Sequence, residues 1–224
     1  MVSSAARAFE YYAGACDKLQ GDTIPLSTRI GNTSVTFNGI SAPLYFVSGG
    51  QVNAQLPWDV LPQGTTTGTA NVVVTVNGVA SAPKQVPVST FSPNMFAIAG
   101  PGFAIAINPD GSLAAPAGSI PGFPTRPAKA GEALILLANG LGPVTPTVAS
   151  GAPGLPVRNT NTVPQVLIGG VGAVVQFSGL SPQFPGINQI NIVVPSGVSG
   201  NAVPLQLRMG GITSSDKVII AVGP

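Results

Sequence analysis

The chain has 224 residues, and only 7% of them are charged, against about 25% in an average soluble protein. Hydrophobic residues make up 44%, and 29 Gly and 23 Pro are spread along the sequence. This composition excludes a disordered chain, which has high charge and low hydrophobicity, and a helical bundle, whose solvent faces need Glu, Lys and Arg. It predicts an all-β protein with uncharged polar outer faces and Gly/Pro turns.

The net charge of +2 comes from a few basic residues that are scattered along the chain. Because nucleic-acid binding needs a concentrated basic surface, we expect no nucleic-acid partner. The longest uninterrupted apolar run, residues 133–138, is far shorter than the ~20 residues of a membrane helix. We therefore expect no membrane span.

The N-terminal segment, residues 1–22, differs from the rest of the sequence. Its apolar residues recur at the spacing of one helix face: Ala5, Phe9, Tyr12, Cys16 and Leu19. This spacing predicts a short helix over residues 4–20. The segment lacks the basic and apolar regions of a secretory leader.

An internal repeat organises the remaining sequence. Three pairs of blocks align in the same order: 35–47 with 166–178, 51–57 with 189–195, and 74–88 with 207–221. The alignment places Gly39 on Gly170 and Asn53 on Asn191. Three blocks in one order indicate two copies of a single unit.

Each copy is predicted to consist of short strands joined by turns. Asn-Gly and Gly-Gly dipeptides between β-rich runs predict tight hairpins, and alternating residues predict half-buried strands over 51–56 and 189–194. The expected buried, inward-facing residues are Val52, Ala54, Leu56, Ile190, Ile192 and Val194. We predict two tandem immunoglobulin-like β-sandwiches, over residues 23–90 and 131–224, with a short N-terminal helix before them.

Residues 91–130 are expected to join the two sandwiches. A strand is predicted over 103–108, and the sequence Asn-Pro-Asp-Gly at 108–111 predicts a type I turn. The lone Asp110 is expected to serve this turn rather than a calcium ion. Residues 114–129 are rich in Pro, Ala and Gly and are predicted to form a stiff linker.

The two sandwiches differ in one expected strand. Residues 132–138 suit the first strand of the second sandwich, whereas residues 1–22 occupy that place in the first. The first sandwich is therefore predicted to be incomplete, because an empty slot exposes unpaired backbone groups. Two fillers remain open: the N-terminal helix could cover the gap, or a strand from a neighbouring chain could add to it and give self-association.

Five blocks of the sequence carry a family resemblance: FNGISAPLYFVSGGQVNAQLP, VVVTVNGVASAP, INPDGSL, LILLANGLGPV and NQINIVVPSGVSGNAVPLQLRMGGITS. They resemble the uncharacterised Solibacter-type C-terminal domain, which recurs at the ends of large secreted acidobacterial proteins. The resemblance covers residues 24–222. It implies tandem sandwiches similar to the IPT/TIG immunoglobulin-like class, an extracellular or cell-surface location, and no known activity or catalytic residues.

No arrangement in the sequence indicates catalysis. Without histidine, Ser-His-Asp and Cys-His arrangements are excluded. Ser81 and Ser214 each begin a Ser-x-x-Lys motif, but both lie between strands, where residues three apart point to opposite faces. The seven carboxylates hold no matching positions in the two copies, and zinc lacks ligands. We expect no catalytic residue, metal or cofactor, although an enzyme of unfamiliar type stays a third alternative.

The only tryptophan, Trp58, follows the 51–56 strand and stands beside Asp59. It could cover the end of the first sandwich core, since Trp is usually largely buried, or form a stacking platform for a sugar. Our first hypothesis is a non-enzymatic module outside the cytoplasm for spacing, adhesion or assembly. The alternative is a carbohydrate-binding or carbohydrate-active protein whose glycan site contains Trp58 and Asp59.

Overall fold

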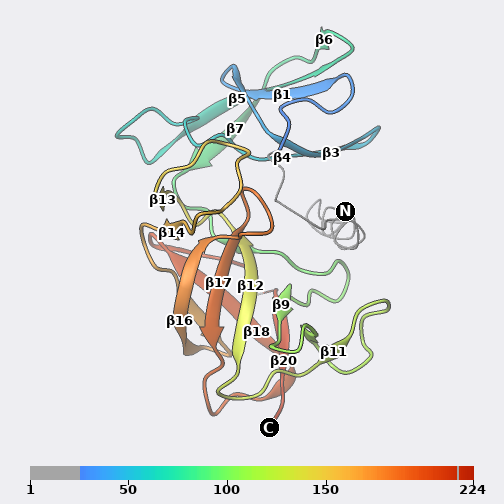
Figure 1. The fold of residues 1–224 in the computed structure, drawn as a ribbon, viewed down its shortest axis with the longest axis vertical. Coiled ribbons are helices and arrows are strands. Elements are labelled where there is room, and N and C mark those ends of the chain that lie inside the picture. The colour runs from blue at the N-terminus through green and yellow to red at the C-terminus, as the bar shows by residue number, and fades with distance from the viewer. Residues whose placement is uncertain (1–25, 216) are drawn as a thin grey trace.

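The computed structural model describes residues 26–215 and 217–224. Every regular element in this part of the chain is a strand, and the sheets form a sandwich-like arrangement (Figure 1). The predicted all-β class is confirmed. The helix expected over residues 4–20 lies outside the described residues.

The strands fall into two groups along the chain. We call residues 26–90 the N-terminal unit and residues 91–224 the C-terminal unit. The strands of the N-terminal unit are β1 (Thr33–Phe37), β2 (Ile40–Ser41), β3 (Leu44–Ser48), β4 (Gln51–Ala54), β5 (Thr67–Val76), β6 (Val79–Ala80) and β7 (Lys84–Ser89). Those of the C-terminal unit are β8 (Asn94–Met95), β9 (Ala106–Ile107), β10 (Leu113–Ala114), β11 (Thr125–Arg126), β12 (Ala133–Asn139), β13 (Val144–Thr145), β14 (Asn159–Thr160), β15 (Gln165–Ile168), β16 (Val171–Leu180), β17 (Asn188–Val193), β18 (Gly200–Met209), β19 (Ile212–Thr213) and β20 (Ile219–Val222).

The N-terminal unit contains two sheets. One has the order β2-β1-β5-β6, with β7 also paired to β5, and the other is the two-stranded sheet β3-β4. Val35 of β1 and Leu44 of β3 are buried in a common cluster, against which Val52 of β4 and Val74 of β5 pack. A small apolar core therefore lies between the two sheets.

The C-terminal unit encloses a larger core. Its long strand β16 first pairs with β15 and then, from Val174 onward, with β17. On the other side of β17 lies β12, and β15 continues to β18. Figure 1 shows these strands gathered at the end of the molecule opposite β1 and β5. The core combines buried residues from β12, β15, β17 and β18: Leu134, Leu136, Val166, Ile190, Ile192, Leu205 and Leu207. Ala173 and Val175 of β16 are partly buried and pack against it.

Strand pairing confirms the repeat at the level of register. Val35 pairs with Val74 in the N-terminal unit, and the aligned residues Val166 and Leu207 pair in the C-terminal unit. The pairing of β3 with β4 shifts by one residue just after Leu44, and the pairing of β16 with β17 shifts at the aligned position. The two copies thus share their hydrogen-bonding pattern and a β-bulge.

The predicted tight hairpins are also confirmed. Four two-residue turns connect strands, and both central residues of each turn have positive φ: Asn38 (51°) and Gly39 (82°), Asn77 (52°) and Gly78 (82°), Gly169 (58°) and Gly170 (82°), Gly210 (57°) and Gly211 (79°). This is the geometry of type I′ turns, whose twist matches that of the flanking strands. It explains why these positions carry only Asn and Gly.

The expected inward-facing residues are buried in one copy only. Ile190, Ile192 and Val194 are buried, as predicted. Val52 and Ala54 are half-buried, and Leu56 is 39% exposed, so its predicted burial is wrong. The physical reason is coverage: β17 lies between β12 and β16, whereas β3 is the one strand in the described residues that pairs with β4.

Residues 91–130 pack against β12 and its neighbours inside the C-terminal unit. Strands β8 and β9 both pair with β12, and Phe103 and Ile105 form a second apolar cluster with Leu137. The predicted turn at 108–111 is confirmed, because the Gly111 amide donates to the Asn108 carbonyl at 2.9 Å. The Pro-rich stretch 114–129 also contributes buried side chains, which include Ile120.

Candidate binding cleft

Polar contacts join the two units next to the end of β4. The Gly151 amide donates to Gln55 Oε1 at 2.7 Å, and the Trp58 amide donates to Ser150 Oγ at 3.0 Å. The Leu26 amide donates to the Gly151 carbonyl at 2.8 Å. Residues on both sides of β4 are thus fastened to one loop of the C-terminal unit.

Two glycines permit this close approach. Gly151 has φ +82°, and a Cβ there would lie 3.0 Å from the ring of Pro43. Gly186 has φ +70°, and a Cβ there would lie 2.5 Å from the Gln55 side chain. A larger residue at either position would strain the backbone, and at position 186 it would also displace the Gln55 side chain.

A cleft of about 820 Å³ lies between the units, a volume in the range of small-ligand pockets. One wall belongs to the N-terminal unit and consists of Tyr45 and residues 52–58, 60–65 and 88–90. The other wall belongs to the C-terminal unit and consists of Ser92, Asn94, Phe96, Leu137, Phe184 and residues 139–143 and 186–188. The cleft therefore follows β4 and the segment after it.

None of the described residues that line the cleft carries a charge. The lining combines apolar side chains such as Trp58 and Phe96 with amides such as Asn53, Asn139 and Asn188. A charged ligand would lose its water there without gaining a countercharge. The surface therefore suits a neutral ligand that has apolar groups and hydrogen-bonding groups.

The structure separates the two predicted site residues. Trp58 is 38% exposed and lines the cleft, whereas Asp59 is exposed and does not line it. Asn53, which the alignment had singled out only as a repeat position, also lines the cleft. Its Oδ1 accepts from Gln51 Nε2 at 2.7 Å, and its buried Nδ2 has no hydrogen-bond partner among the described residues.

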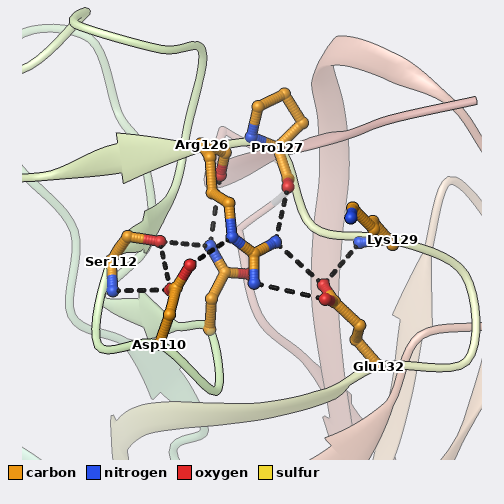
Figure 2. A network of polar contacts seen from close by, with 7 residues as sticks. Asp110, Ser112, Arg126, Pro127, Lys129 and Glu132 are labelled. Atoms are coloured by element: carbon orange, nitrogen blue, oxygen red, sulfur yellow. Dashed lines mark hydrogen bonds and ion pairs between the residues drawn. The ribbon is translucent and has the colours of Figure 1, made fainter.

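Away from the cleft, Arg126 links two carboxylates (Figure 2). Its Nε donates to Asp110 at 2.5 Å, and its two terminal nitrogens donate to Glu132 at 2.9 and 3.2 Å. Asp110 also accepts from the amide and hydroxyl of Ser112, and Glu132 accepts from the Lys129 amide. The network fastens the 108–112 turn, β11 and the start of β12 to one another.

These hydrogen bonds fix the charge state of both carboxyls. Arg126 and then Ser112 hold the pKa of Asp110 well below its usual range, and Arg126 lowers the pKa of Glu132. Both groups are therefore ionised at neutral pH, whereas a general acid needs a raised pKa. The arrangement acts as a structural clasp and does not offer the proton donor of a carboxylate-pair hydrolase.

The two Ser-x-x-Lys motifs have matching structural roles. Ser81 Oγ accepts from the Val74 amide at 3.1 Å, and Ser214 Oγ accepts from the Leu207 amide at 2.9 Å. Because Val74 and Leu207 are aligned in the repeat, each serine fills the same place beside its strand. Its hydroxyl is engaged in holding the backbone.

Comparisons with known proteins do not identify a family for this chain. No protein-family model matches the chain, and no curated protein or solved structure matches it. The resemblance to the Solibacter-type domain therefore stays a prediction. Over residues 26–215 and 217–224, no cluster of three or more potential metal ligands occurs, and no helix is long and apolar enough to cross a membrane.

Proposed function

We propose that the chain is a non-enzymatic β-sandwich module that assembles with a polypeptide partner through the cleft beside β4. One observation carries the proposal. Strand β4 borders an uncharged cleft, and none of the other strands described in this chain pairs with its second edge. Exposed strand edges bind extended polypeptide readily, because the unpaired backbone groups supply ready hydrogen bonds.

The chemistry of the cleft supports a binding role over catalysis. Its described lining has no carboxylate, lysine or arginine, so no side chain there titrates near neutral pH. The serines of the two Ser-x-x-Lys motifs hold backbone amides. An extracellular or cell-surface location is part of the proposal and rests on the family resemblance alone.

The alternative is a carbohydrate-binding protein, and the placement of Trp58 favours it. A half-exposed indole in a neutral, amide-lined cleft is a suitable stacking surface for a sugar ring. Asp59, the other residue expected at a glycan site, does not line the cleft. Stacking would therefore have to be complemented by amide groups such as that of Asn53.

Probing one peptide array and one glycan array with the full chain separates the two functions. The assembly proposal predicts binding to uncharged peptides and none to glycans. Glycan binding that Trp58→Ala abolishes would establish the alternative instead. Asp59→Asn is the matched control, because it changes the neighbouring residue without altering the cleft lining.

A further inference from the structure

We propose that β4 takes up an extended, uncharged segment of another polypeptide as an additional antiparallel strand, in the place that β12 holds in the C-terminal unit. This inference rests on the proposed function. It specifies the direction of the partner strand, its register against β4 and the chemistry of its side chains. The strand would lie in the cleft that follows β4.

The backbone of β4 turns alternate hydrogen-bonding groups to the edge opposite β3. In an antiparallel strand, alternate residues turn both their amide and their carbonyl to the same side. The Gln55 amide donates to the Pro43 carbonyl at 2.8 Å, toward β3. Ala54 and Val52 therefore turn their amides and carbonyls to the other edge. Within the chain that the structure describes, no strand pairs with that edge.

The C-terminal copy supplies the template. There the Val194 amide donates to the Glu132 carbonyl of the chain leading into β12 at 2.9 Å, and Val194 aligns with Leu56. Leu136 of β12 lies opposite Ile190 of β17. Because Ile190 aligns with Val52, the register places an incoming residue of the Leu136 type opposite Val52. The incoming strand runs antiparallel to β4, as β12 runs antiparallel to β17.

Burial defines which side chains the strand must bring. Leu134 and Leu136 of β12 are fully buried in the C-terminal core. At the aligned place beside β4, Val52 and Ala54 are only half-buried, so apolar surface remains to be covered. Since opposite residues of paired strands point to the same face, the partner needs apolar residues at alternate positions. The uncharged lining selects against charged residues between them.

The probe is the sequence of β12 itself. A capped peptide of residues 131–139, with the change Glu132→Gln to remove its charge, is titrated against the full chain and followed by fluorescence anisotropy. Two methylated peptides test the geometry. The Leu137 amide of β12 donates away from β17, to the Ile105 carbonyl at 3.1 Å. Its neighbour Leu136 therefore turns its amide toward β17.

We expect the unmodified peptide to bind, and the peptide N-methylated at Leu137 to bind equally well. N-methylation at Leu136 removes a hydrogen bond to β4 and is expected to weaken binding by roughly tenfold or more. Equal weakening by the two methyl groups would overturn strand addition, yet it would leave the proposed binding of polypeptide in the cleft intact. Absence of binding by all three peptides would overturn the inference as well.

Disulfide formation tests direction and site. In a Cys16→Ser, Leu56→Cys variant, a peptide with cysteine at its second position, which aligns with Glu132, should cross-link. A peptide with cysteine at its last position should not, and the reverse result would overturn the antiparallel register. Binding that appears only after deletion of residues 1–25 would assign the edge to the chain's own N-terminal segment. Light scattering provides a further test. A dimer that does not bind the peptide, and that the peptide does not dissociate, would show that a second copy of the chain occupies this edge of β4.

Discussion

The two copies of the repeat have the same strand register, yet their aligned strands β4 and β17 differ in coverage. Strand β17 is paired on both sides, and its inward residues Ile190 and Ile192 are fully buried. Strand β4 is paired with β3, and its inward residues are half-buried. Register is a local property of the repeated sequence, whereas burial depends on whether a further strand completes the sheet. Equal sequence blocks therefore do not give equal cores.

The contrast extends to how each unit is held. The core of the C-terminal unit contains residues from β8 to β20. The ion pairs of Arg126 also hold the 108–112 turn, β11 and the start of β12 together. The N-terminal unit has two small clusters, around Leu44 and around Val60. We expect the C-terminal unit to carry most of the stability, and the N-terminal unit to gain stability from a strand bound at β4.

The largest effect should come from truncating aligned core residues. Ile190→Ala leaves a cavity in a fully buried site and is expected to cost about 2–5 kcal/mol of unfolding free energy. Val52→Ala, at the aligned position in the half-buried face, is expected to cost about 1 kcal/mol. Urea unfolding of both variants measures the difference. Equal losses would show that β4 is covered as fully as β17.

A second pair of variants tests the aligned turn positions Asn77 and Gly210. Both have φ near +55°, a conformation that Asn and Gly tolerate. A Cβ on Gly210 would lie 2.3 Å from the ring of Phe91, however, whereas Asn77 already has its side chain. Gly210→Asn should therefore cost about 1–3 kcal/mol through overpacking, and Asn77→Gly less than about 1 kcal/mol.

Thermal unfolding gives both values, and the double variant Phe91→Ala, Gly210→Asn supplies the control. If the ring causes the cost, adding Asn at 210 to Phe91→Ala should be nearly neutral. A cost that persists without the ring would place the cause in the backbone conformation. The Phe91 ring would then not explain why the two turn positions respond differently to substitution.

Much of the fold could be predicted from the sequence, because it depends on local chemistry. Repeated blocks fixed the pairing of Val35 with Val74 and its counterpart, and Asn-Gly or Gly-Gly dipeptides fixed the I′ turns. The repeat also predicts an incomplete first sandwich, which stays a prediction because residues 1–25 lie outside the part of the chain that the structure describes. Alternation alone nevertheless predicted burial for Leu56, because period-two patterning identifies a face and does not show whether anything covers it.

The second wall of the cleft could not be predicted. Residues 139–143 and 186–188 reach it through the relative placement of the two units, which no local pattern encodes. The Arg126 clasp was missed for a similar reason, since its partner Asp110 is sixteen residues away. A signal did exist: Glu132 is only six residues from Arg126, across a Pro-containing turn.

The smallest effect should come from the clasp, which distinguishes the C-terminal unit because both ion pairs of the described residues belong to it. The lowered pKa values of Asp110 and Glu132 mean that the unfolded chain binds more protons in acid. The stabilisation is therefore complete above about pH 5 and is lost progressively as the pH falls through 4 and below. Arg126→Gln should cost about 1 kcal/mol at pH 7, the upper end for partly exposed ion pairs.

Urea unfolding at pH 7, 5, 4 and 3 tests this directly. Because Arg126→Gln removes the largest cause of both lowered pKa values, the stability of this variant should fall less between pH 5 and pH 3 than that of the unchanged chain. Arg208→Gln removes the same charge from the same unit, at a residue outside both ion pairs, and should keep the original pH dependence. If both variants reduce the pH dependence of the unfolding free energy equally, the net charge of the chain would determine its stability in acid. The clasp would then not account for the difference between the two units.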